Sequence, residues 1–371
     1  MDFSERLYAR YPSLRRLRLH HIERHWLTIS FFFGFVVDAL TLRRVDQLFD
    51  NLVLAWYILL AMGSMVALYA ATAGKLSEKY GRSVRDWSPL VIQYALGGLA
   101  SGMLIFYSKS GSWLASWPFL ILILAVMVGN ERLTRRAERL LLNLVMLFVG
   151  IFSYAALIVP VILGKIGAWI FLLAGALACA LMYGFVRLLS RVVPNFMQAN
   201  MRAAVFALAS VYFALNVLYF TNIIPPIPLS LTALGVYHSV ERLPDGNYAL
   251  IYEQGPWYHL FKASDTTFHY QAGDTIYCFA SVFAPTRLST EIFHRWEYYD
   301  ESAGKWQTHG RFAYGIGGGR DEGYRGYTAI TRVQEGKWRC SVETARGQVL
   351  GRDTFRVVSG AVPRGLVNEV R

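Results

Sequence analysis

The sequence predicts two parts of different fold class: an all-α bundle of seven transmembrane helices, followed by an all-β sandwich of the immunoglobulin-like type. Long apolar runs fill residues 26–223, and the chain is 54% hydrophobic but only 17% charged, which is too apolar for two water-soluble domains. From residue 237 the pattern changes to short alternating runs rich in Tyr, Phe, Val and Thr, typical of strands. Pro225, Pro226 and Pro228 lie between the two parts. Because proline cannot continue a helix, these residues mark the end of the last predicted helix.

Residues 1–25 form a basic segment with six arginines. Its leucines are compatible with a short helix lying at the membrane interface, and a solvated leader is an equal alternative. The basic region is too long for a cleaved signal peptide, and no small-residue cleavage site follows the first apolar run. We therefore expect the first apolar run, near 26–42, to remain in the protein as a membrane anchor.

Seven apolar segments follow, each close to the ~20 residues that a helix needs to cross a bilayer. They lie near 26–42, 50–72, 88–107, 113–130, 140–160, 167–187 and 203–223. With a cytoplasmic N-terminus, the cytoplasmic side carries 17 Lys and Arg against four on the other side. This asymmetry follows the positive-inside rule and places the C-terminal domain outside the cytoplasm.

The net charge of +12 could suggest a nucleic-acid-binding protein. Residues 1–234, however, carry 21 Lys and Arg against 10 Asp and Glu, whereas residues 235–371 carry 16 against 15. The excess charge therefore flanks the predicted helices, where it fits a lipid bilayer as the partner and argues against nucleic acid.

Asp38 is the only acidic residue well within a predicted span, and Gln93, Asn143 and Asn216 are the main amides of the spans. An intramembrane carboxylate is costly and often functional. The plainer interpretation is that Asp38 lies near the outer end of a short helix and either pairs with Arg43 or Arg44 or reaches the membrane interface. No span carries a central Lys, Arg, Glu or His, which argues against an ion-coupled transporter. Gly98 and Gly102 are spaced for close helix packing, either within one bundle or in a homo-oligomer.

A junction at 224–236 leads into the β domain at 237–358, and a tail follows at 359–371. The predicted strands lie near 247–253, 257–262, 267–271, 274–284, 290–299, 305–314, 325–333, 336–344 and 348–358, one of them being a loop. Strands at this spacing are typical of a sandwich. Cys278 and Cys340 fall on predicted inward faces, so either a disulfide or two separate buried thiols fits the pattern.

Three motifs of the β domain give a resemblance: His294-Arg295-Trp296, then Gly336-Lys337-Trp338-Arg339, then Gly347-x-x-x-Gly351-x-x-x-Phe355. Together they resemble domain-of-unknown-function family 2914 over roughly 255–358, and the helical part resembles family 5924. The resemblance implies a multi-pass protein of the bacterial inner membrane with a periplasmic domain, and it brings no activity. Cys340 stands where the family's strand is expected to be aliphatic.

Catalytic signatures are missing from the sequence. The Gly315–Arg320 run lacks the last glycine of a dinucleotide fingerprint, and no Gly-x-Ser-x-Gly elbow occurs. The five histidines of the β domain have no zinc-like spacing, so we expect no metal or cofactor. The remaining candidates form a binding patch for a protein or glycan of the cell envelope: His294, Arg295, Arg320, Tyr324, Arg325 and Tyr327. An ordinary glycine-rich turn is the plainer interpretation of this patch.

Two functions remain open. The first is a non-enzymatic envelope protein that presents a β domain to a partner, and the shortage of catalytic motifs and of intramembrane charge favours it. The second is a membrane enzyme or transporter acting on a lipid-linked envelope substrate, with Asp38 among its working residues.

Overall fold

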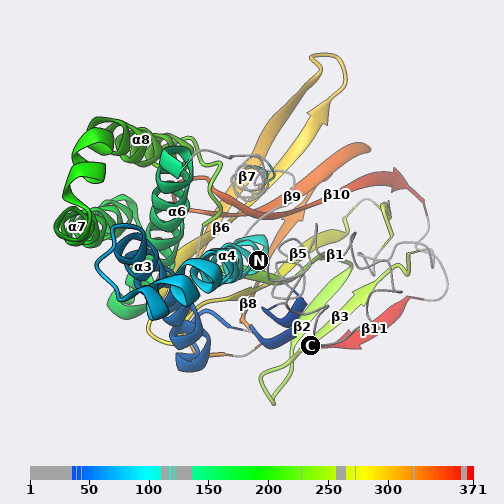
Figure 1. Ribbon diagram of the computed structural model, residues 1–371. Helices are drawn as coiled ribbons and strands as arrows, with labels where there is room; N and C mark the ends of the chain where they lie inside the picture. Colours follow the sequence, from blue (N-terminus) through cyan, green and yellow to red (C-terminus); the bar gives the residue numbers. More distant parts are fainter. Residues whose placement is uncertain are drawn as a thin grey trace, which may run out of the picture. The chain divides into compact units, whose positions relative to one another are not determined.

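The computed structural model describes residues 36–109, 136–255, 265–360 and 366–371, apart from 39, 43, 227, 272 and 321 within them, and the isolated positions 117 and 121. These residues form helices in the first part of the chain and strands in the second (Figure 1). By contacts the chain divides into two compact units. The first contains most of the helical residues, and the second contains all residues from 213 onward together with 106–122 and 156–174.

Five helices are described: α3 (Leu48–Thr72), α4 (Glu78–Lys109), α6 (Arg136–Leu163), α7 (Ala168–Val192) and α8 (Pro194–Phe220). All five contain a stretch long and apolar enough to cross a membrane, and they correspond to five of the predicted spans. The first and fourth predicted spans, 26–42 and 113–130, lie largely outside the described residues, as does the basic segment 1–25. The number seven therefore stays a prediction.

The helices extend further than the apolar runs predict. Segments 73–87 and 188–202, which connect predicted spans, are mostly helical, because α4 begins at Glu78, α7 ends at Val192 and α8 begins at Pro194. The added helical turns carry long charged side chains, which can extend along the helix to reach water. Charged residues therefore do not end the helix where the apolar run ends. Pro194 begins α8, at a helix position where its missing N–H is not needed.

Glycines on α4 allow close packing against α3 within the first unit. A β-carbon at Gly98 would lie 2.5 Å from the Tyr57 ring, and one at Gly102 would lie 2.6 Å from Leu54 Cδ2. Both contacts are made inside one chain, as the intrachain interpretation of this glycine stripe predicts.

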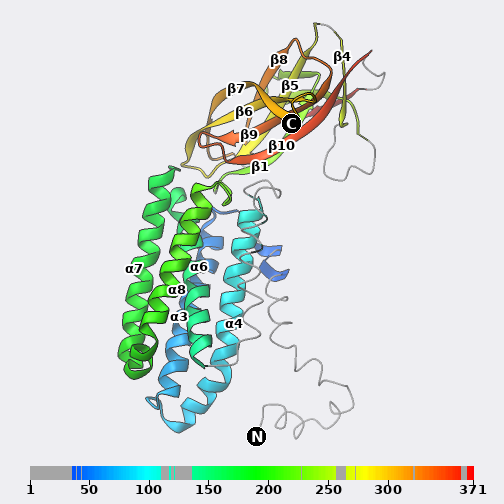
Figure 2. The ribbon, with the colours of Figure 1, turned by 90° about the horizontal axis from the view of Figure 1, so that it is seen from above.

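The second part of the chain contains eleven described strands. They are β1 (Ser230–Tyr237), β2 (Ser239–Arg242), β3 (Tyr248–Tyr252), β4 (Thr267–Tyr270), β5 (Thr275–Phe283), β6 (Ser289–Asp300), β7 (Lys305–Gly317), β8 (Tyr324–Thr331), β9 (Gly336–Thr344), β10 (Val349–Ser359) and β11 (Val367–Val370). They form three sheets with the orders β4-β10-β9-β6-β7, β1-β5-β8 and β11-β3-β2. Figure 2 shows β6, β7, β9 and β10 of the largest sheet side by side.

Three strands lie where none was predicted. The second half of the predicted junction 224–236 is β1, which pairs with β5, and the predicted tail 359–371 ends in β11, which pairs with β3. Strand β2, also unpredicted, pairs with β3. Each of these segments becomes a strand because it hydrogen-bonds to another strand of its sheet. The alternation of residues within the segment does not reveal that pairing. The predicted strand 257–262 lies outside the described residues.

Two hydrophobic clusters fill the space between the five-stranded sheet and the β1-β5-β8 sheet. The first includes Trp296, Trp338 and Phe355, and the second includes Ile292, Val342 and Leu350. A third cluster, around Phe279 and Leu250, lies between β1-β5-β8 and the small sheet. On β9, Trp338, Cys340 and Val342 belong to the first two clusters, which confirms the predicted inward face of Cys340.

Candidate functional site

The six residues of the predicted patch lie in three different places in the β domain. His294 and Arg295 are neighbours on β6, but His294 is fully buried, whereas the Arg295 side chain is 29% exposed. Successive side chains of a strand point to opposite faces. The other four residues belong to β8 and the loop before it. The expectation that His294 contributes to a surface patch is therefore wrong.

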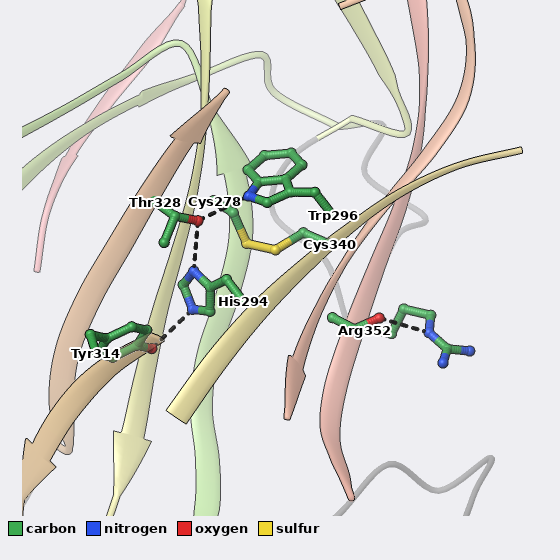
Figure 3. The surroundings of a disulfide bond; sticks show 8 residues. Cys278, His294, Trp296, Tyr314, Thr328, Cys340 and Arg352 are labelled. Carbon is green, nitrogen blue, oxygen red and sulfur yellow. Dashed lines mark hydrogen bonds between the residues drawn. A yellow bond between two sulfur atoms is a disulfide. The ribbon is translucent and has the colours of Figure 1, made fainter. Parts of the chain in front are cut away.

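His294 instead belongs to a buried hydrogen-bonded cluster (Figure 3). Its Nδ1 is 3.0 Å from Thr328 Oγ1, and its Nε2 is 2.9 Å from the Tyr314 hydroxyl. Thr328 Oγ1 also accepts a hydrogen bond of 2.9 Å from Trp296 Nε1. Burial lowers the pKa of His294 to about 3, because the charged imidazolium would have to leave water. This histidine is therefore a neutral structural group at physiological pH.

A disulfide joins Cys278 of β5 to Cys340 of β9, with the two Cα atoms 6.5 Å apart. It links the two sheets that enclose the core, and the His294 ring lies beside it (Figure 3). The two sulfurs and a ring nitrogen of His294 lie within 4.8 Å of one another. Metal-binding cysteines are thiolates, so this group cannot act as a three-residue metal site while the bridge is intact.

Two of the predicted residues, Arg320 and Arg325, line a shallow depression of about 470 Å³. The rest of its wall comes from the turn between β2 and β3 and from the loop before β8: Arg242, Asp245, Gly246, Asn247, Glu322 and Gly323. Arg325 pairs with Glu322, and its Nη1 donates a hydrogen bond of 2.8 Å to Asn247 Oδ1. Three guanidinium groups thus meet two carboxylates at one surface site.

Aromatic rings lie near this depression. The Arg320 guanidinium is 5.7 Å from the centre of the Tyr324 ring, whereas Tyr324 itself is half-buried. Tyr327 is 42% exposed and contacts Tyr248 edge-on, with the ring centres 6.1 Å apart. Planar donors, carboxylates and exposed rings are the groups that bind sugars and polar peptide segments.

Sequence reasoning missed one wall of the depression. Pro244-Asp245-Gly246-Asn247 has the composition of a turn, and the structure places a turn there, in which Asp245 Oδ1 accepts the Asn247 N–H at 2.9 Å. The available signal was the amide and charged residues that accompany this turn, above all Arg242.

In the helical unit, Asp38 is buried and does not pair with Arg44. It accepts a hydrogen bond of 2.9 Å from the Tyr57 hydroxyl and another from Ser101 Oγ. Arg44 pairs with Asp46 instead, and Arg43 lies outside the described residues.

The three predicted intramembrane amides do not join Asp38. Gln93, Asn143 and Asn216 are each half-buried on different helices, and none of them hydrogen-bonds to Asp38 in the part of the chain that the structure describes. These residues therefore do not form one polar site with the carboxyl group.

Residues 289–357 match the model of a family described as "Protein of unknown function (DUF2914)". The match confirms the resemblance predicted for the C-terminal domain and extends from the start of β6 into β10. No curated protein matches the chain. Among solved structures, the chain is similar to the Pseudomonas fluorescens alkylpurine DNA glycosylase AlkC bound to DNA containing an abasic site analogue, at 9% identity, covering 85% of this chain and 100% of that one. The TM-score of 0.21 is too low to support any argument.

Proposed function

We propose that this protein is an integral protein of the bacterial inner membrane that presents a periplasmic β domain to a protein or glycan of the cell envelope. In this proposal seven helices anchor the chain, with the N-terminus in the cytoplasm, and the β domain is an immunoglobulin-like sandwich. The membrane part resembles family 5924, and a homo-oligomer is compatible with the proposal. The excess of basic residues on one side of the predicted spans supports the orientation, and the disulfide fits an oxidising compartment.

The depression lined by Arg242, Arg320 and Arg325 is the observation that carries this proposal. It combines fixed donors, since Arg325 is held by Asn247, with the more exposed guanidinium groups of Arg242 and Arg320. Binding sites need some groups that are preorganised and some that are free to engage the partner. The depression offers both kinds.

Site-specific photo-crosslinking in living cells tests the proposal. A photoreactive phenylalanine analogue replaces Tyr327, and a matched control replaces Phe312 of β7, which is equally exposed at 41% against 42%. We expect an adduct from position 327 only, lost when Arg242→Ala and Arg320→Ala are combined. Mass spectrometry then identifies the adduct as protein or glycan. Equal adducts at both positions, or an adduct that survives the arginine substitutions, would contradict the proposal.

The contacts of Asp38 favour a second candidate, a membrane enzyme or transporter that handles a lipid-linked envelope substrate. A carboxyl group that is buried between helices and bonded to two hydroxyls is the kind of intramembrane group that often takes part in function. This candidate predicts that Asp38→Asn abolishes the cellular phenotype that depends on the protein while its abundance is unchanged. The binding proposal predicts that the same variant stays functional.

A further inference from the structure

A row of arginines crosses the outer face of the five-stranded sheet. The register places Arg311 of β7 beside Arg295 of β6, Arg295 beside Ser341 of β9, and Ser341 beside Arg352 of β10. Neighbouring strands lie about 4.8 Å apart, so the row extends over roughly 14 Å. Three of its four positions are cationic, and Arg339 of β9 lies on the same face.

Two buried carboxylates hold part of this charge. Glu343 lies between Arg311 and Arg295, with its Oε1 at 2.7 Å from Arg311 Nε and its Oε2 at 3.4 Å from Arg295 Nε. Glu297 takes a bidentate pair from Arg339, at 2.5 and 2.9 Å. The row and its neighbour Arg339 therefore bring four guanidinium groups together with two carboxylates.

Aromatic rings fix the same two arginines that the carboxylates hold. The Arg311 guanidinium lies 3.8 Å from the centre of the Phe293 ring, and that of Arg339 lies 4.0 Å from Trp306. A stacked and ion-paired guanidinium has little capacity left for a ligand. Arg311 and Arg339 are therefore structural members of this face.

Arg295 and Arg352, on either side of Ser341, are different. Arg352 donates from Nε to Ser341 Oγ at 3.0 Å and forms no ion pair with a described carboxylate. Arg295 makes only the longer ion pairs to Glu343 and Glu297, at 3.4 and 3.6 Å, and its Nε has no hydrogen-bond partner among the described residues. Because Arg295 Nε is buried and Arg352 Nε donates to Ser341, the donors left for a ligand are the Nη groups of the two guanidiniums.

The electrostatic environment of Arg352 agrees with this picture. Its pKa is lowered by partial burial first and then by the positive charges of Arg339 and Arg295, while the carboxylates of Glu297 and Glu343 act in the opposite direction without cancelling the shift. Like charges held this close repel one another. An anion placed between Arg295 and Arg352 would relieve that repulsion.

We propose that Arg295 and Arg352, flanking Ser341, bind the carboxylate or phosphate groups of an acidic glycan. Two guanidinium forks match the oxygen geometry of either anion. An extended peptide would instead dock by main-chain hydrogen bonds along a sheet edge. Here β6 and β9 lie inside the sheet with both neighbours paired, so only side chains are available for recognition. The pair lies on a different sheet from the depression, so the two proposals can fail separately.

The test is binding of defined probes to the full-length protein in lipid nanodiscs, measured by calorimetry. The probes are an oligogalacturonate, which carries carboxylates, a mannose-6-phosphate oligosaccharide, neutral maltoheptaose and poly-L-glutamate. We expect one of the two acidic glycans to bind, with affinity falling as salt rises; which one binds distinguishes carboxylate from phosphate. Arg295→Gln and Arg352→Gln should each weaken binding about tenfold or more, as expected for losing charge-assisted hydrogen bonds.

The matched control is Arg356→Gln, an exposed arginine on the same face of β10, four residues beyond Arg352 and outside the row. It removes the same charge and should leave binding within about threefold, since only long-range attraction changes. Arg352→Lys should restore part of the affinity that Arg352→Gln loses. The proposal is overturned if neither acidic glycan binds, if maltoheptaose or poly-L-glutamate binds as tightly, or if Arg356→Gln is as harmful as Arg352→Gln.

Discussion

Acid should destabilise this protein through one buried histidine. His294 is fully buried, and its pKa falls from the ordinary 6.5 to about 3 in the folded chain. Between these two values the unfolded chain binds a proton that the folded chain refuses, so the stabilising effect is complete above pH 6.5 and is lost as the pH falls toward 3. Each pH unit in this window corresponds to about 1.4 kcal/mol. From pH 7 to pH 4.5 the loss is therefore about 2–3 kcal/mol.

The assay compares the wild-type chain with His294→Gln, both in detergent, by urea unfolding monitored through near-ultraviolet circular dichroism. Glutamine keeps a donor and an acceptor for Thr328 and Tyr314 but does not titrate. Its absolute stability at pH 7 is not the readout, because the two side chains differ in shape. The readout is the change in the free energy of unfolding between pH 7 and pH 4.5.

We expect the wild type to lose about 2–3 kcal/mol more than the variant over this interval. The pKa values of the carboxyl groups of Glu253 and Glu297 are also lowered in the folded chain. These carboxylates lose their stabilising effect as the pH falls, but they do so equally in both proteins and cancel in the comparison. Parallel pH profiles for the two proteins would refute the reasoning, because they would mean that folded His294 accepts a proton as readily as the unfolded chain does.

Three further predictions concern the framework. Replacing Cys278 and Cys340 together by Ala should lower the free energy of unfolding by about 4 kcal/mol, the chain-entropy value for cysteines 62 residues apart, measured by the same urea titration. Gly98→Val places a side chain against the Tyr57 ring and should cost about 1–3 kcal/mol, visible as a lower thermal midpoint in detergent; an unchanged midpoint would mean that α3 and α4 separate freely. Replacing 224–228 by Gly and Ser should leave membrane insertion intact but make the junction sensitive to limited proteolysis, because Pro225 and its buried neighbours are then lost; equal resistance to protease would contradict this.

Local pattern predicts the regular elements well where the pattern is strong. Strand β9 has its predicted range, Gly336–Thr344, because its alternation is regular and a glycine with positive φ begins it. Strand β1 was missed because Ser230–Tyr237 follows the prolines and alternates weakly. Its partner β5 supplies the hydrogen bonds that make it a strand, and that pairing is a tertiary property that no local window contains.

The candidate site shows the same division. Grouping His294 with Arg295 was an error that the sequence could have prevented, since adjacent strand residues point to opposite faces. That Arg320 and Arg325 lie in one depression with Arg242 and Asn247 could not be predicted from the sequence. It depends on how the β2–β3 turn lies beside the loop before β8, about 75 residues further along the chain, and therefore on the packing of two sheets.

The range of the family match separates the two proposed sites. It covers residues 289–357 and so contains the whole arginine row, from Arg295 to Arg352, with the carboxylates and rings that hold its structural members. The depression depends on Arg242 and Asn247, which lie outside that range. A ligand bound by the row therefore depends on residues inside the matched range, whereas a partner bound in the depression also depends on residues of the strands that precede that range. The inward side chains of β6 explain why the row can be rigid: His294 and Trp296 are fixed beside the disulfide, so Arg295, on the opposite face of the same strand, projects from a backbone that the core holds in place.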